Sequence, residues 1–106
     1  MFLNCKSLTK VYLGENVKMI YGSSFIGCKN LKKINLSKKN KNYKIYKNIL
    51  YSKDFKTLVA VPAKLTKAKI NSKTTTIGQY SFSSSKIKTI TISKKVETIE
   101  YGAFYN

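Results

Sequence analysis

The chain repeats its own pattern of apolar residues, and this repetition constrains the fold more than any other feature. Residues 2–13 match residues 25–36 at an offset of 23, and every apolar position agrees. A third copy, one residue shorter, begins at Phe82. The common frame is Phe-x5-Leu-x2-Ile-x-Leu-x3-Val-x2-Ile-x4-Phe, where x is any residue. Self-similarity at such a period predicts stacked copies of one supersecondary unit.

Each part of the frame predicts a local structure. The Leu-x2-Ile-x-Leu part ends in the alternation that is typical of a strand with one buried face. The Val-x2-Ile part predicts a second extended piece on the opposite wall, and the part around Phe predicts a turn or short helix. Because one such unit cannot bury both walls alone, the units must stack. We therefore predict a β-dominated solenoid with short helical turns, made of about three units of 22–23 residues and one elongated unit.

The predicted domain covers residues 1–106, with repeats that start near Phe2, Phe25 and Phe82. Its core consists of the apolar frame positions. These are Phe2, Leu8, Val11, Leu13, Ile20, Phe25, Leu31, Ile34, Leu36, Ile70, Ile77, Phe82, Ile87, Ile90, Ile92, Ile99 and Phe104.

The elongated unit covers residues 37–70, where the frame loses its period. Residues 43–51 are β-rich, residues 52–56 predict a turn, and residues 57–61 predict a second strand that ends at Pro62. We expect this hairpin to stack with the other units, because its apolar residues require burial. A hairpin that projects outward is the alternative.

The chain lacks the residues on which most catalytic chemistries depend. There is no His, which is the commonest general base and metal ligand. Two Cys cannot complete a four-ligand zinc site, and the isolated Gly residues form no phosphate-binding loop. The four acids Glu15, Asp54, Glu97 and Glu100 are spread over three regions. We therefore predict a non-enzymatic protein with no catalytic residue, no cofactor and no metal.

The frame resembles the BspA-like leucine-rich repeats, whose unit reads roughly Ala-Phe-x2-Cys-x2-Leu, then Leu-x2-Ile-x-Ile, then Val-x2-Ile. The matching residues are Phe25, Cys28, Leu31, Ile34 and Leu36, with a second set at Phe2, Cys5, Leu8, Val11 and Leu13. The third copy has Ser85 in place of Cys. This resemblance covers nearly the whole chain and implies a leucine-rich-repeat fold. It also implies an extracellular or cell-surface protein with a role in adhesion.

Each end of the chain supports one expectation. The segment from Met1 to Lys6 lacks the basic flank, apolar block and cleavage site of a signal peptide, so we expect it not to be one. Because Phe2 and Phe104 occupy the same frame position, we expect the chain to be part of a longer array.

The 21 Lys residues, with no Arg and four acids, give a net charge of +17. This charge favours salt-dependent attraction to polyanions. However, the lysines are spread over both walls and the loops, and nucleic-acid-binding surfaces usually use Arg for phosphates and bases. We therefore expect no specific nucleic-acid partner. Because no apolar run approaches the length of a membrane span, we also expect no membrane insertion.

The outward positions of the first strand wall form the candidate binding face, because solenoids use their extended walls for recognition. These residues are Lys10, Tyr12, Lys33, Asn35, Thr89 and Thr91. We predict that they bind a protein or glycan on a cell surface or matrix. Two alternatives stay open, namely a structural spacer in a larger surface protein and a Lys-rich binder of glycosaminoglycans. Unpaired strand edges at the end repeats would also permit end-to-end self-association.

Tyrosines and cysteines supply secondary candidates. Tyr43, Tyr46 and Tyr51 lie in the elongated unit and suit recognition if exposed, whereas Tyr21, Tyr80 and Tyr101 are expected to pack near the turns. Cys5 and Cys28 share a frame position and should stack. Their spacing permits a disulfide, but a pair of buried free thiols is the preferred interpretation.

Overall fold

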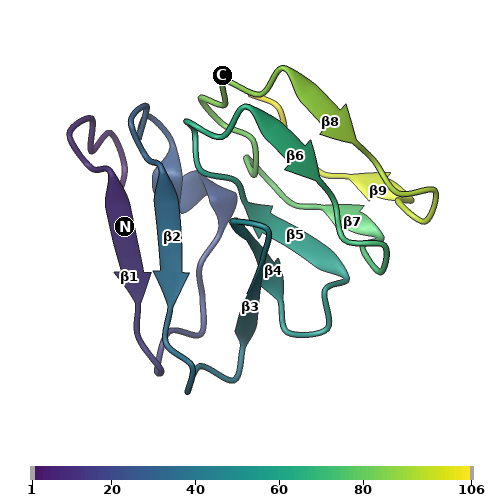
Figure 1. Cartoon of the computed structure of the whole chain (residues 1–106), viewed down its shortest axis with the longest axis horizontal. Helices are drawn as coiled ribbons and strands as arrows, with labels where there is room; N and C mark the ends of the chain where they lie inside the picture. The colour runs from purple at the N-terminus through teal and green to yellow at the C-terminus, as the bar shows by residue number, and fades with distance from the viewer. Residues whose placement is uncertain (1, 106) are drawn as a thin grey trace.

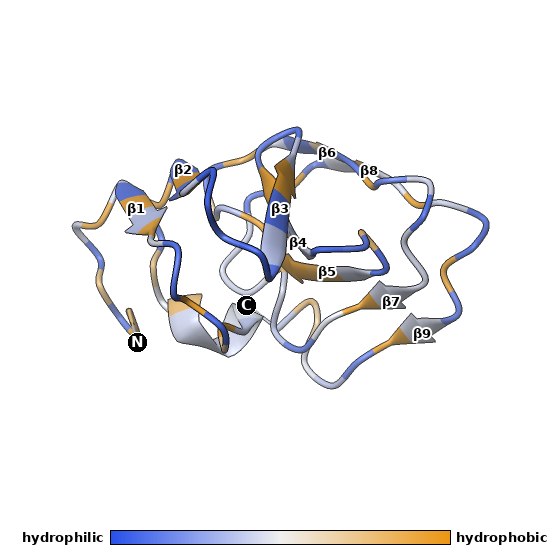
Figure 2. Cartoon of the chain, turned by 90° about the horizontal axis from the view of Figure 1, so that it is seen from below, coloured by the Kyte–Doolittle hydropathy of each residue, from blue (hydrophilic) through white to orange (hydrophobic). Residues whose placement is uncertain are grey.

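Equivalent segments of the chain pair side by side as parallel strands in the computed structural model, which describes residues 2–105 (Figure 1). Strand β1 (Lys10–Leu13) pairs with β2 (Lys33–Leu36), and Lys10 lies opposite Lys33. Strand β6 (Lys67–Lys69) pairs in the same way with β8 (Thr89–Thr91). We call these four strands the first wall, because they lie along one side of the molecule in Figure 2.

The second wall contains the strands that face the other side of the molecule (Figure 2). Strands β5 (Thr57–Ala60), β7 (Thr76–Ile77) and β9 (Thr98–Ile99) run parallel to one another in a five-stranded sheet with the order β3-β4-β5-β7-β9. A 3-10 helix, η1 (Gly22–Phe25), is the single helix among residues 2–105. The structure is therefore β-dominated, as predicted, with almost no helix.

The elongated unit contains one more strand than the sequence suggested. Residues 43–51 form two strands, β3 (Tyr43–Tyr46) and the first part of β4 (Ile49–Ser52), which pair antiparallel. Lys47 and Asn48 connect them with φ angles of 48° and 69°. Two positive φ angles are typical of a type I′ turn, a turn that is usually signalled by Gly. Residues 43–51 are therefore β-rich, as predicted, but they form two strands. The turn between the strands was not predicted, because Lys-Asn is a weak turn signal.

The core lies between the two walls and forms two clusters, one around Phe25 and one around Phe82. The elongated unit contributes to both, since Leu50 belongs to the first cluster and Ile49 and Leu58 belong to the second. These three side chains are completely buried, so the hairpin packs within the molecule. Of the predicted core positions, those that are buried are Val11, Leu13, Ile20, Phe25, Leu31, Ile34, Ile70, Ile77 and Phe82. Those that are half-buried are Phe2, Leu8, Leu36, Ile87 and Ile90.

Three predicted core residues need correction, because Ile92, Ile99 and Phe104 are exposed. They belong to the last repeat of the chain, and no later repeat within residues 2–105 covers them. The frame thus gives the direction of these side chains but not their burial.

The two cysteines differ in environment although they share a frame position. Both are free, Cys28 is buried and Cys5 is exposed. The Cys28 thiol donates a hydrogen bond to the Phe2 carbonyl at 2.8 Å, and burial raises its pKa. The expectation of two buried thiols was therefore wrong for Cys5, which lies in the first repeat and has no earlier repeat among residues 2–105 to cover it.

Candidate binding surfaces

The outward side chains of β1 and β2 form the first part of the candidate face. Along β1, Lys10 and Tyr12 are exposed while Val11 and Leu13 are buried, as expected for a strand with one buried side. Tyr12 is 67% exposed and lies next to Asn35 of β2, which is half-buried. Lys10 and its neighbour Lys33 are both exposed. This part of the face therefore combines an aromatic ring, an amide and two cations.

Thr89 and Thr91 lie apart from the other four predicted residues. They belong to β8, where Lys67 and Lys69 of β6 are their neighbours. The two threonines and the two lysines are all exposed. The six predicted residues thus lie on two separate two-stranded sheets of the first wall rather than in one continuous row.

Sequence analysis missed Lys67 and Lys69 as outward residues of the first wall. The segment from Leu65 to Ile70 fits the Leu-x2-Ile-x-Leu frame, with Ala68 at the Ile position. Ala68 is buried, as that position requires. A search that allowed a small apolar residue there would have found this strand.

The second wall has a different outward surface, which contains threonines and glutamates. Thr57, Thr76 and Thr98 lie opposite one another across β5, β7 and β9. Two of the four acids, Glu97 and Glu100, flank β9. The outward positions of β1, β2 and β6 thus include four lysines, whereas those of β5, β7 and β9 are threonines with two glutamates beside them.

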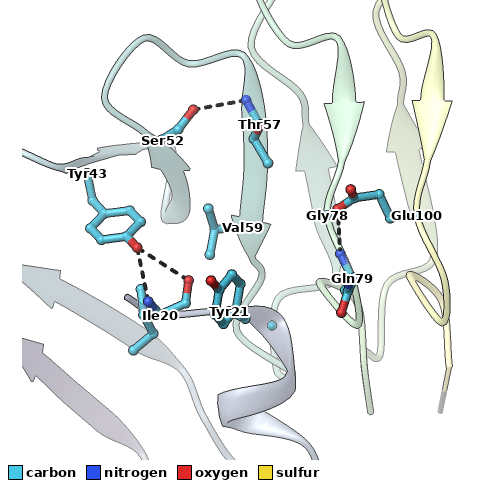
Figure 3. Close-up of a pocket in the computed structure, with 10 residues that line it drawn as sticks. Ile20, Tyr21, Tyr43, Ser52, Thr57, Val59, Gly78, Gln79 and Glu100 are labelled. Atoms are coloured by element: carbon cyan, nitrogen blue, oxygen red, sulfur yellow. Dashed lines mark hydrogen bonds between the residues drawn. The ribbon is translucent and has the colours of Figure 1, made fainter. Parts of the chain in front are cut away.

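A pocket of about 300 Å³ opens on the second wall, between the segment that precedes η1 and the strands β5 and β7 (Figure 3). Its apolar part comes from Ile20, Val59 and the ring of Tyr43. The other lining residues are Tyr21, Gly22, Ser52, Thr57, Gly78, Gln79 and Glu100. No local sequence pattern indicates this pocket, because its residues come from segments that lie far apart in the chain.

Two tyrosines of the elongated unit have structural rather than surface roles. The Tyr43 hydroxyl accepts a hydrogen bond from the Ile20 N–H at 3.0 Å and donates one to the Lys18 carbonyl at 2.9 Å. The Tyr51 hydroxyl accepts from the Asn71 N–H at 3.0 Å, and burial raises its pKa. Both side chains are buried, so neither forms an exposed recognition surface, although Tyr43 lines the pocket. Tyr46 is half-buried.

The tyrosines near the turns meet the expectation in part. Tyr21 and Tyr101 are exposed, and Tyr80 is half-buried. Tyr80 packs edge-to-face against Tyr101 and Tyr105, with ring centroids 5.8 and 5.7 Å away. The prediction that these tyrosines pack near the turns therefore holds for Tyr80 and its contact with Tyr101, although Tyr101 and Tyr21 are largely exposed.

Among residues 2–105, no three His, Cys, Asp or Glu side chains gather in a way that could hold a metal ion. The same residues contain no helix of the length and apolarity needed to cross a bilayer.

The pattern of repeats matches a known family along its whole length. The family model of the BspA type leucine rich repeat region matches residues 1–106, with six copies. The chain belongs to the BspA-type leucine-rich repeat family. The resemblance seen in the sequence is thereby confirmed.

Solved structures of two bacterial proteins support this assignment. A leucine-rich repeat protein from Eubacterium ventriosum is 34% identical with a TM-score of 0.85, and the match covers 93% of this BspA-type chain. The pneumococcal vaccine antigen PcpA is 26% identical with a TM-score of 0.82, over 92% of this chain. The matches cover 27% and 25% of those two proteins, so this chain spans about a quarter of their length. No curated protein matches the chain significantly.

Proposed function

We propose that this BspA-type chain is a non-enzymatic binding module of a cell-surface or extracellular protein, and that its partner is a protein or glycan on a cell surface or matrix. Two findings support a surface location, namely the family and the similarity to a pneumococcal vaccine antigen. In this proposal the repeats form a solenoid, and the first wall contacts the partner.

The observation that carries the proposal is the exposure of Tyr12 next to the pair of Lys10 and Lys33. A tyrosine that is 67% exposed costs free energy in water and gains it when a partner covers the ring. The adjacent Lys10 and Lys33 would orient an acidic or hydrogen-bonding partner around that ring. The wall is built on paired strands, which hold these side chains in fixed relative positions.

Binding to immobilised fibronectin, fibrinogen, heparin and DNA, measured from low salt to well above physiological salt, tests this function. We expect one matrix protein to bind at physiological salt and to lose at least tenfold in affinity with Tyr12→Ala. Tyr101→Ala is the matched control, because Tyr101 is also largely exposed, at 79%, but lies outside the first wall. No binding to any of the four would favour a spacer role and contradict the proposal.

A second candidate function is the binding of polyanions such as glycosaminoglycans. It is favoured by the position of Lys10, Lys33, Lys67 and Lys69 on the same wall. In this case heparin affinity would fall steeply as salt rises, since the binding energy comes from counterion release. Affinity would also fall with Lys33→Ala and be insensitive to Tyr12→Phe.

A further inference from the structure

The pocket on the second wall combines an apolar floor with polar side chains that have unused hydrogen-bonding capacity. We propose that this pocket binds a single hexose unit of a glycan. The inference deepens the proposed binding function and rests on it for the ligand class, but it places the sugar on the wall opposite Lys10 and Tyr12 (Figures 2 and 3).

Tyr43 shapes the pocket because its hydroxyl takes the place of the hydrogen-bonding partners that a neighbouring strand would supply. Its hydroxyl bonds the Ile20 N–H and the Lys18 carbonyl, which are backbone groups that would otherwise pair with a strand. The chain at Ile20 is therefore held beside the five-stranded sheet without joining it. The pocket lies in the space that remains between Ile20 and Val59 of β5 (Figure 3).

Close backbone packing fixes the other side of the pocket. A Cβ atom built on Gly22 would lie 2.5 Å from the Tyr80 carbonyl carbon and 2.6 Å from the Ser81 nitrogen. The segment that carries Tyr21 is therefore seated directly on the segment that follows Gln79. A preformed pocket of this kind loses little conformational entropy when it is filled.

The polar side of the pocket has three groups that can still bond a ligand. Glu100 Oε1 accepts a hydrogen bond from the Gln79 N–H at 3.2 Å, and the carboxylate has further lone pairs. The Gln79 amide and the Thr57 hydroxyl have no hydrogen-bond partner among residues 2–105. Ser52 differs, because its hydroxyl already accepts from the Thr57 N–H at 3.0 Å and donates to Asp54 at 2.8 Å.

This set of groups fits a sugar better than an ion. A hexose offers hydroxyls that both donate and accept, which a carboxylate, an amide and a hydroxyl can satisfy together. It also offers apolar C–H faces, for which the exposed Tyr21 ring is suitable. Among the described lining residues Glu100 alone carries a charge, and it disfavours sulfated or phosphorylated ligands.

Backbone amide NMR during titration with methyl glycosides of glucose, galactose, mannose and N-acetylglucosamine tests the proposal. We expect saturable shifts of the Gly22, Gly78 and Gln79 amides, with a dissociation constant on the order of millimolar for one sugar unit. Thr57→Val and Glu100→Ala should each weaken binding about tenfold, since each removes a hydrogen-bonding group. The matched control is Glu97→Ala, because Glu97 lies on the same wall but does not line the pocket.

The outcomes separate this inference from the wall proposal. N-acetyl-lysinamide is titrated in parallel, and shifts of the same amides by this cation but by none of the sugars would overturn the hexose assignment. Absence of shifts at about 100 mM sugar, or shifts that are unchanged in Thr57→Val, would overturn it as well. Sugar binding that persists in Tyr12→Ala supports a site independent of the first wall. Loss of matrix-protein binding alone would affect only the first-wall proposal.

Discussion

Ile77 and Ile99 occupy the same place in two successive repeats, yet one is buried and the other is not. They lie opposite each other where β7 pairs with β9. Ile77 has Leu58 of β5 on its other side and is completely buried, whereas Ile99 has no second neighbour among residues 2–105 and is 56% exposed. The frame therefore determines that a side chain points inward, and the repeats on either side determine whether it is buried.

The phenylalanines between the walls repeat this contrast. Phe82 and Phe104 stack with ring centroids 4.8 Å apart, but Phe82 is buried and Phe104 is 48% exposed. At the other end, Phe25 is buried and its stacking partner Phe2 is half-buried. A middle repeat thus gains burial from two neighbours, and an end repeat from one.

The largest effect is expected when the two isoleucines are truncated. Ile77→Ala should lower the free energy of unfolding by about 2–5 kcal/mol, because it removes buried methyl groups and leaves a cavity. Ile99→Ala should cost less than about 1 kcal/mol, since most of its surface is already in water. Urea unfolding followed by circular dichroism measures both. Equal losses would show that the last repeat is covered in solution.

A second prediction compares a glycine that is packed against another repeat with a glycine that faces open space. Gly22→Ala should cost about 1–3 kcal/mol, because the new Cβ meets the backbone of Tyr80 and Ser81, which cannot move without repacking. Gly14→Ala is the control, since a Cβ there meets nothing within 4 Å. The same unfolding measurement applies. A neutral Gly22→Ala would mean that the first repeat is not seated on the later ones as closely as described.

The third prediction compares a buried hydroxyl with an exposed one. Tyr43→Phe should cost about 1–3 kcal/mol, because it leaves the Ile20 N–H and the Lys18 carbonyl without their partner. Tyr12→Phe should be nearly neutral, as Tyr12 is exposed on the first wall. Hydrogen exchange of the Ile20 amide provides a local readout. Unchanged protection in Tyr43→Phe would contradict the role given to this hydroxyl.

The sequence predicted what the repeat frame encodes and missed what depends on neighbours. The pairing of Lys10 with Lys33 follows from the 23-residue offset, because equivalent segments of stacked repeats lie side by side. The roles of Tyr43 and Tyr51 could not be predicted, since their hydroxyls bond backbone groups more than 19 residues away. The pocket was hidden for the same reason. Its floor joins Ile20 to Val59, which no local pattern connects.

The smallest effect is expected from Ser81→Ala, which gives a middle repeat the residue that the last repeat has at the same position. Ser81 and Ala103 both precede a stacked Phe, and the buried Ser81 hydroxyl has no hydrogen-bond partner among residues 2–105. A buried hydroxyl without a partner costs free energy that Ala does not, so Ser81→Ala should raise the free energy of unfolding by up to about 1 kcal/mol. The reciprocal change, Ala103→Ser, should lower it by a similar amount, since Ala103 is also buried. Urea unfolding of both variants and of the double exchange measures these shifts. A loss of stability in Ser81→Ala would show that a bound water satisfies the hydroxyl, and that this position in the middle repeat is polar by requirement.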